Sequence, residues 1–145
     1  MHFEGIYCLT TPHHTTPQHH TTNYTHTMKT TLTTYDIVTL LRADEFASWS
    51  RAGAFALAEH LEEMEEATGE EMELDVVAIR CDFSEYTSLI EWASDHFGGA
   101  GSWQEPLGVD SYDLSEEDTD AAIRDFIHDN GILIEFDDGV IVFSF

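Results

Sequence analysis

The stretch "GILIEFDDGVIVFSF" (residues 131–145) decides the fold class of this protein. Two apolar runs rich in Ile, Val and Phe flank Asp138-Gly139, and such β-branched and aromatic residues favour strands. An Asp-Gly pair between two such runs is a strong signal for a tight hairpin, with Asp137 and Asp138 as turn residues. The sequence therefore predicts an antiparallel β-hairpin over this stretch.

Upstream of the hairpin, the hydrophobic residues recur at helical spacing. The longest such segment runs from about Ser50 to Thr68 and stops before Gly69, a residue type that commonly terminates helices. We expect one apolar stripe of this helix to face the core, because the following residues fall at i, i+3, i+4, i+7 and i+10: Ala54, Leu57, Ala58, Leu61 and Met64.

A shorter helix is expected before this segment and a strand after it. Thr33 or Thr34 can cap the first helix, with Asp36 in its first turn. The stretch "LDVVAIRCDF" (residues 74–83) is rich in β-branched residues and predicts a buried strand. The inward residues of the short helix are expected to be Ile37, Val38, Leu40 and Leu41.

Two further helices precede the hairpin. Ser84 is expected to cap the first of them, which Gly98 and Gly99 end, and Ser115 with Asp118 resembles a capping box that opens the second. The order α-α-β-α-α-β-β predicts an α+β fold, in which about four helices cover one face of a three-stranded, mainly antiparallel sheet. The residues expected inward on the earlier helix are Tyr86, Leu89, Ile90, Trp92 and Ala93.

The charge of the chain is unusual. Its 29 Asp and Glu residues face 5 Lys and Arg residues, so the formal net charge is −24, and the only lysine is Lys29. Such a field repels nucleic acid and anionic membranes and attracts basic protein surfaces. Glu4 is the only acid before Met28, so the acidity belongs to residues 28–145.

The first 27 residues differ sharply in composition from the rest. The run "TTPHHTTPQHHTTNYTHT" (residues 10–27) has neither helical nor strand periodicity, which predicts a disordered leader. His, Thr, Pro, Gln and Asn can all be encoded by A and C alone, so we interpret residues 1–27 as upstream sequence read through and Met28 as the natural start. Paired histidines here, such as His13 and His14, would bind metal only loosely. Residues 28–145 are predicted to form a single acidic domain.

Motifs that carry enzymatic chemistry are missing from the sequence. It contains no Gly-rich phosphate loop, Cys-x-x-Cys, His-Glu-x-x-His or Gly-x-Ser-x-Gly, so we expect no catalytic residues, no metal and no cofactor. Cys8 and Cys81 make neither a metal motif nor a disulfide framework, and Cys81 is expected to be a small core residue. No membrane-length apolar run and no secretory signal appear, which favours the cytoplasm.

Acidic residues gather on two of the predicted helices without interspersed lysines. Like charges at i, i+4, such as Glu59 with Glu63, each cost about 0.2–0.5 kcal/mol, so a surface shaped for stability alone would mix signs. Trp103, in a Gly-rich loop, is expected to be exposed as a partner anchor, whereas Trp92 is expected in the core. The candidate partner-binding residues are Glu59, Glu62, Glu63, Glu66, Glu70, Glu116, Glu117, Asp118, Asp125 and Trp103.

Three interpretations of this acidity compete. The first is a nucleic-acid mimic that blocks a DNA- or RNA-binding protein, because carboxylates along a helix are spaced much like phosphates along a strand. The second is salt adaptation of an unrelated binding domain in a halophile. The third is an immunity or adaptor protein for a basic toxin or enzyme. In the first, the partner is a basic nucleic-acid-binding protein, and the chain itself binds neither nucleic acid nor membrane.

Three stretches carry a resemblance to a known group of proteins: "YDIVTLLRADEFASWS" (35–50), "VVAIRCDFSEY" (76–86) and "IEFDDGVIVFSF" (134–145). Residues 28–145 resemble small acidic proteins of unassigned function that phages and bacteria encode. The resemblance implies phage association but no mechanism and no site residues. Acidic phage proteins that inhibit restriction or CRISPR systems are similar in size and charge only.

Overall fold

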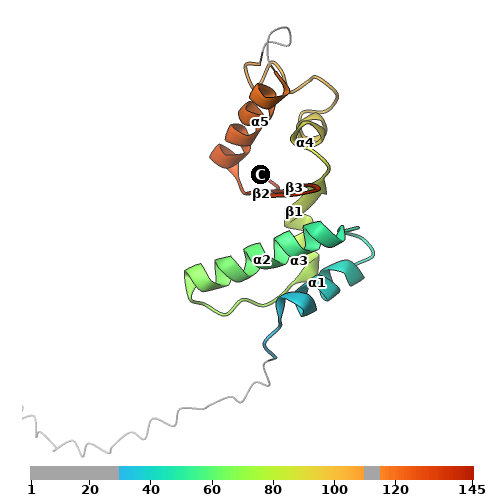
Figure 1. Ribbon diagram of the computed structural model, residues 1–145, viewed down its shortest axis with the longest axis vertical. Helices are drawn as coiled ribbons and strands as arrows, with labels where there is room; N and C mark the ends of the chain where they lie inside the picture. Colours follow the sequence, from blue (N-terminus) through green and yellow to red (C-terminus); the bar gives the residue numbers. More distant parts are fainter. Residues whose placement is uncertain (1–29, 110–114) are drawn as a thin grey trace, which may run out of the picture. The chain divides into compact units, whose positions relative to one another are not determined.

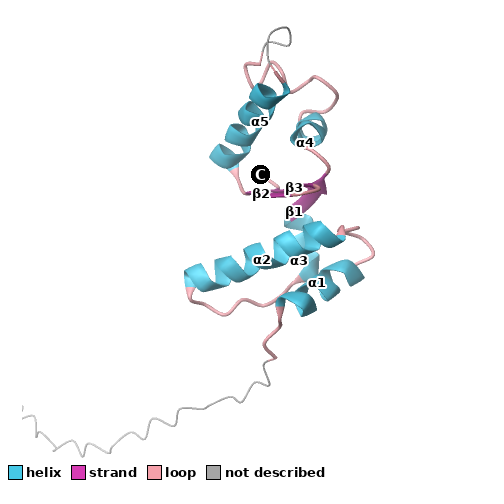
Figure 2. Cartoon of the chain, viewed as in Figure 1, coloured by secondary structure: helices cyan, strands magenta, loops and turns pink. Residues whose placement is uncertain are grey.

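The protein has an α+β fold, as the sequence predicts. The computed structural model describes residues 30–109 and 115–145, and Thr31–Phe145 forms one compact unit. The leader predicted over residues 1–27 lies outside the described residues. Helices and strands are distinguished in Figure 2, and in chain order they are α1 (Thr34–Ala43), α2 (Arg51–Thr68), α3 (Val76–Asp82), β1 (Phe83–Tyr86), α4 (Leu89–His96), α5 (Glu116–Asn130), β2 (Leu133–Phe136) and β3 (Gly139–Phe143).

The described strands form one antiparallel sheet of order β1-β3-β2, and the predicted C-terminal hairpin is confirmed as β2–β3. The turn residues are Asp137 and Asp138, whereas Gly139 already opens β3 opposite Phe136. A glycine is needed there for a close approach, since a Cβ atom on Gly139 would collide with the carbonyl oxygen of Tyr86 on β1. The central strand β3 is therefore paired with β1 along one edge and with β2 along the other.

Helices cover both faces of the sheet, so the expectation of a single covered face is wrong (Figure 1). Ile141 of β3 packs in one cluster with residues of α1, α2 and α3, while Val140 and Val142 pack in a second cluster with α4 and α5. Successive side chains of a strand point to opposite faces, and this strand is apolar on both. Its unbroken apolar run therefore indicates two covered faces.

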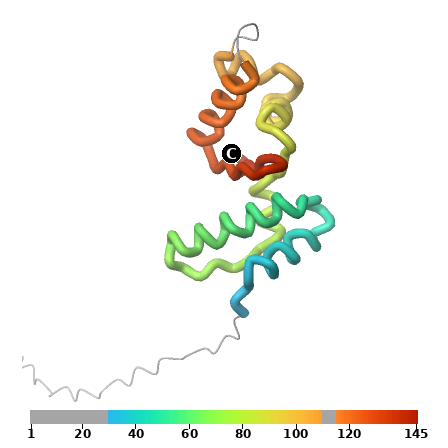
Figure 3. The backbone as a smooth tube through the Cα atoms, viewed as in Figure 1, coloured from blue at the N-terminus to red at the C-terminus, as the bar shows by residue number. Residues whose placement is uncertain are grey.

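The strand predicted over residues 74–83 is wrong for most of its length. Val76–Asp82 is the short helix α3, and the chain then passes directly into β1 at Phe83 (Figure 3). The helix begins here because the Asp75 carboxylate accepts hydrogen bonds from the backbone N–H groups of Val77 and Ala78, both at 3.0 Å. A short apolar run does not by itself distinguish a strand from a helix.

The start of the next helix was also predicted four residues early. Ser88, not Ser84, caps α4, because its hydroxyl accepts the backbone N–H of Glu91 at 3.1 Å. Ser84 and Tyr86 belong to β1 instead. Leu40, expected inward on α1, is 44% exposed, while its neighbour Leu41 is fully buried.

The remaining helix-end signals are confirmed. Thr33 and Asp36 form a capping box at α1, and Ser50 caps α2 through the N–H of Gly53 at 2.9 Å. Gly69 ends α2 in the left-handed conformation with φ of 67°. These signals are local in sequence, which is why they could be read without knowledge of the tertiary fold.

Candidate functional site

Two of the glutamates on α2 have structural partners within the fold. The Glu62 carboxylate accepts the hydroxyl of Thr34 at 2.9 and 3.0 Å and so ties α2 to the first residue of α1. The Glu65 carboxylate accepts the backbone N–H of Met72 at 3.0 Å and so links the segment that follows α2 to the helix. The sequence names Glu62 as a partner-binding residue, but in the fold it is partly buried and hydrogen-bonded to Thr34.

Three other glutamates of α2 form an exposed row. Glu59, Glu63 and Glu66, called here the α2 acidic row, lie at i, i+4 and i+7 on the side opposite the buried residues Ala54 and Leu57. A step of four residues advances about 6 Å along a helix. None of the three carboxylates has an ion pair or hydrogen bond within the part of the chain that the structure describes. Glu70, just beyond the helix, is also exposed.

The α2 acidic row is unfavourable for its own helix: Glu66 lies in the last turn, where the helix dipole disfavours an acid, and Glu59 and Glu63 form a like-charged i, i+4 pair. The first turn of α2 contains no acid and the last turn contains no base, while Arg51 sits at the positive N-terminal end. Acids near a helix C-terminus are unfavourable by about 0.3–1 kcal/mol each, and like-charged neighbours add to this cost. The row therefore has no explanation in the stability of α2.

The three acids in the first turn of α5 have structural explanations. Glu116, Glu117 and Asp118 occupy the first turn, where the helix dipole favours negative charge. The hydroxyl of Ser115 accepts the N–H of Asp118 at 3.2 Å and donates to its carboxylate at 2.7 Å. The predicted cap at Ser115 is thus confirmed. Asp125 is exposed farther along the helix.

The two arginine ion pairs that the structure describes involve acids outside the α2 acidic row. Arg80 pairs with Asp44 at 2.9 Å, and Arg124 pairs with Glu135 at 2.8 Å, joining α5 to β2. The hydrogen bond from Arg124 lowers the pKa of Glu135, which marks a compensated acid. The two groups of predicted site residues, on α2 and α5, belong to elements that cover opposite faces of the sheet.

Trp103 is not the exposed anchor that the sequence predicts. It is 7% exposed and packs in the cluster that contains α4 and α5 residues, together with Val109. Consecutive turns fold this Gly-rich loop inward: Leu107 N–H donates to the Trp103 carbonyl at 3.1 Å, and Val109 N–H donates to Gln104 at 2.8 Å. Trp92 is buried as expected, whereas Cys81, expected in the core, is exposed on α3.

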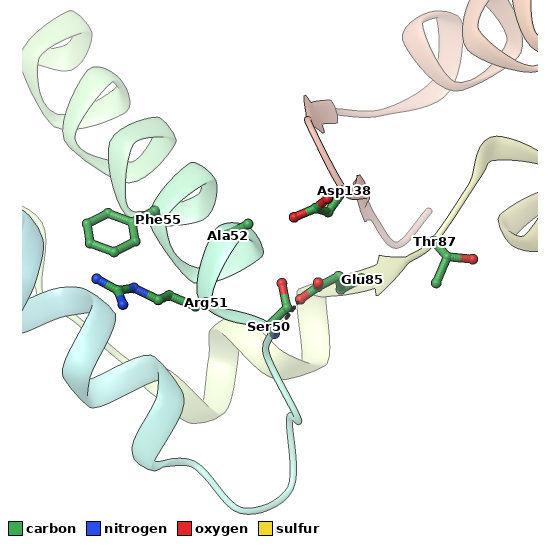
Figure 4. Close-up of a pocket in the computed structure, with 7 residues that line it drawn as sticks. All are labelled: Ser50, Arg51, Ala52, Phe55, Glu85, Thr87 and Asp138. Carbon is green, nitrogen blue, oxygen red and sulfur yellow. Dashed lines mark hydrogen bonds between the residues drawn. The ribbon is translucent and has the colours of Figure 1, made fainter.

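A cavity of about 550 Å³ lies beside the start of α2 (Figure 4). From β1, the Glu85 carboxylate reaches toward Ser50 and accepts its backbone N–H at 2.9 Å. Arg51 points elsewhere, with its guanidinium 5.9 Å from the centre of the Phe55 ring. The carboxylate thus fills the anion-attracting end of α2 and serves to attach the helix to the sheet. The lining residues are Ser50, Arg51, Ala52, Phe55, Glu85, Thr87 and Asp138.

This attachment predicts an unusual effect of substituting Gly53. Replacing a glycine inside a helix with alanine normally stabilises it by about 0.5–1 kcal/mol. A Cβ atom on Gly53 would collide with the Glu85 carboxylate, which can move aside only by giving up its hydrogen bond to Ser50, so Gly53→Ala should cancel the usual gain and destabilise the protein by up to about 0.5 kcal/mol. In a Glu85→Ala background the same change should become stabilising. Urea unfolding of the four proteins of this cycle checks the change of sign, and the same sign in both backgrounds would contradict the contact.

Within residues 30–109 and 115–145, no cluster of three or more potential metal ligands occurs. In the same residues, every helix is too short or too polar to cross a bilayer. Sequence reasoning missed the Thr34–Glu62 and Ser50–Glu85 contacts, because residues far apart in the chain carry no local signal of their pairing.

Comparisons with known proteins gave no match. No family model, no curated protein and no solved structure is similar to this chain at the significance required.

Proposed function

We propose that this protein is a non-enzymatic, cytoplasmic binding protein whose α2 acidic row docks on the basic surface of another protein. The observation that carries the proposal is that Glu59, Glu63 and Glu66 are exposed, unpaired within the described residues and unfavourably placed on their own helix. Docking on Lys and Arg side chains would relieve their mutual repulsion.

The proposed partner is a protein that itself binds DNA or RNA, so the row acts as a nucleic-acid mimic. Its carboxylates are held on a rigid helix, with steps of about 6 Å between neighbours four residues apart. This spacing is comparable with that of phosphates along a nucleic-acid strand. A DNA- or RNA-binding defence protein is the first class to test, because its nucleic-acid groove is basic and would attract a row of carboxylates.

Capture from a lysate of the source cells, followed by competition, tests the class of partner. Proteins retained by the immobilised chain should themselves bind nucleic acid, and added DNA or RNA should release them at a lower charge concentration than polyglutamate does. Retained proteins that resist both nucleic acids would contradict mimicry. A single retained basic protein without nucleic-acid affinity would indicate an immunity or adaptor role.

The salt dependence of folding distinguishes the proposed function from salt adaptation. Screening weakens repulsion among surface carboxylates over a Debye length of about 10 Å at 0.1 M. We therefore expect the protein to be folded in 0.1 M NaCl and its melting temperature to rise moderately with further salt. Circular dichroism at low and molar NaCl measures this, and a chain that folds only in molar salt would favour halophilic adaptation instead.

A further inference from the structure

A second cavity, of about 270 Å³, lies on the face of the sheet that α4 covers. It is separate from the α2 acidic row, which belongs to the helices of the other face. Strands β1 and β3, helix α4 and the segment that follows β3 supply its walls, and we call it the Asp95 pocket. Its lining residues are Ser84, Tyr86, Trp92, Asp95, His96, Val142, Phe143, Ser144 and Phe145.

One wall of the Asp95 pocket carries an uncompensated negative charge. The Tyr86 hydroxyl donates to Asp95 Oδ2 at 3.0 Å, which orients the carboxylate. Burial, followed by the hydrogen bond to Asp95 and its charge, raises the pKa of the Tyr86 phenol. No Lys or Arg of the described residues pairs with Asp95, and Oδ1 accepts no hydrogen bond from them.

Two exposed aromatic residues, His96 and Phe145, line the pocket together with Asp95, whereas the Trp92 ring is buried, with 4% of the residue exposed. The rings of Trp92 and His96 are stacked, with centroids 4.8 Å apart and planes 20° apart. The Phe145 ring lies 5.3 Å from His96 and 6.0 Å from Trp92. Aromatic faces attract cations, and a planar guanidinium can stack on a ring while it hydrogen-bonds to a carboxylate.

We infer that the Asp95 pocket binds a guanidinium group, with Asp95 as its carboxylate partner and the exposed His96 and Phe145 rings as the surface on which it stacks. The net charge of −24 favours a cation over an anion at any polar recess of this protein. A metal ion fits less well, because no three potential metal ligands cluster in the described chain. The guanidinium is carried by an arginine side chain of a protein or by free arginine. The inference does not rest on the partner proposed for the α2 acidic row.

A titration followed by ¹⁵N–¹H NMR tests the pocket directly. The probe is N-acetyl-arginine methylamide, and its uncharged counterpart is the same derivative of citrulline. The arginine probe should shift the amide signals of Tyr86, Asp95, His96 and Ser144, and the citrulline probe should not. Free arginine forms a third arm: tighter binding of the capped residue identifies a protein side chain as the ligand, and tighter binding of the free amino acid identifies arginine itself.

Two variants test whether the Asp95 carboxylate is the group that binds the arginine probe. Asp95→Asn should weaken the arginine probe at least about five-fold, the factor for a strong exposed ion pair. Asp129→Asn removes the same charge from the last turn of α5, outside the pocket, and should leave the affinity within about two-fold. Equal shifts from both probes, unchanged binding by Asp95→Asn, or shifts spread over the acidic surface but not the pocket would each overturn the inference.

Discussion

Trp103→Ala should destabilise the protein by about 3–5 kcal/mol, the usual cost of truncating a buried tryptophan. Trp103 is 7% exposed and packs in the hydrophobic cluster that contains residues of α4 and α5. Removing it leaves a cavity that the surrounding side chains fill only in part. Because a domain has about 5–15 kcal/mol of stability in total, the loss would be a large part of it.

Phe46→Ala is the matched control for that truncation. Phe46 is 82% exposed in the segment between α1 and α2, and the Arg80 guanidinium lies over its ring, 5.0 Å from the ring centre. Its removal should cost less than about 1 kcal/mol. Urea unfolding followed by circular dichroism compares the two. A stable Trp103→Ala variant that loses partner binding would instead support the exposed anchor predicted from the sequence.

Replacing Glu63 and Glu66 with lysine should weaken partner binding at least about 100-fold, because each reversed charge turns an attraction in the interface into a repulsion. Neither side chain has a hydrogen bond or ion pair within the described residues. Glu62, although part of the same acidic helix, is unsuitable for this test, because it holds Thr34 of α1. Its substitution would mix a loss of binding with a loss of packing.

A control must change the net charge equally without touching α2. Glu105→Lys with Asp129→Lys meets this need, because both residues are exposed and neither side chain has a hydrogen bond or ion pair among the described residues. This pair should lower the affinity by less than about ten-fold, through the weaker long-range field alone. Affinities for the captured partner, measured by calorimetry, would show whether the two pairs of substitutions differ. Equal losses would mean that the total charge, not the α2 acidic row, determines binding.

Local signals account for what the sequence could predict. The hairpin, the caps at Ser50 and Ser115 and the stop at Gly69 are each encoded by residues within a few positions of one another. The helix at 76–82 could not be distinguished from a strand, since its apolar run is short and its cap, Asp75, precedes two β-branched residues.

The candidate site was less predictable than the fold. The sequence identifies the acidic residues, but it does not show which of them have a structural partner in the fold and which do not. That distinction depends on tertiary contacts such as Thr34 with Glu62, 28 residues apart. The burial of Trp103 was hidden in the same way, because a Gly-rich loop does not show in its sequence which way it folds.

The central claim is that the α2 acidic row is costly to the folded protein and is therefore present for binding. The unfolding free energy of the Glu63→Lys, Glu66→Lys variant tests this most directly and needs no partner. The change turns two repulsive i, i+4 pairs into attractive ones and places a base near the helix C-terminus. Our account predicts a gain of about 1–2 kcal/mol in stability, whereas Glu116→Lys with Glu117→Lys in α5 should cause a loss. A loss of stability from the α2 substitutions would contradict it.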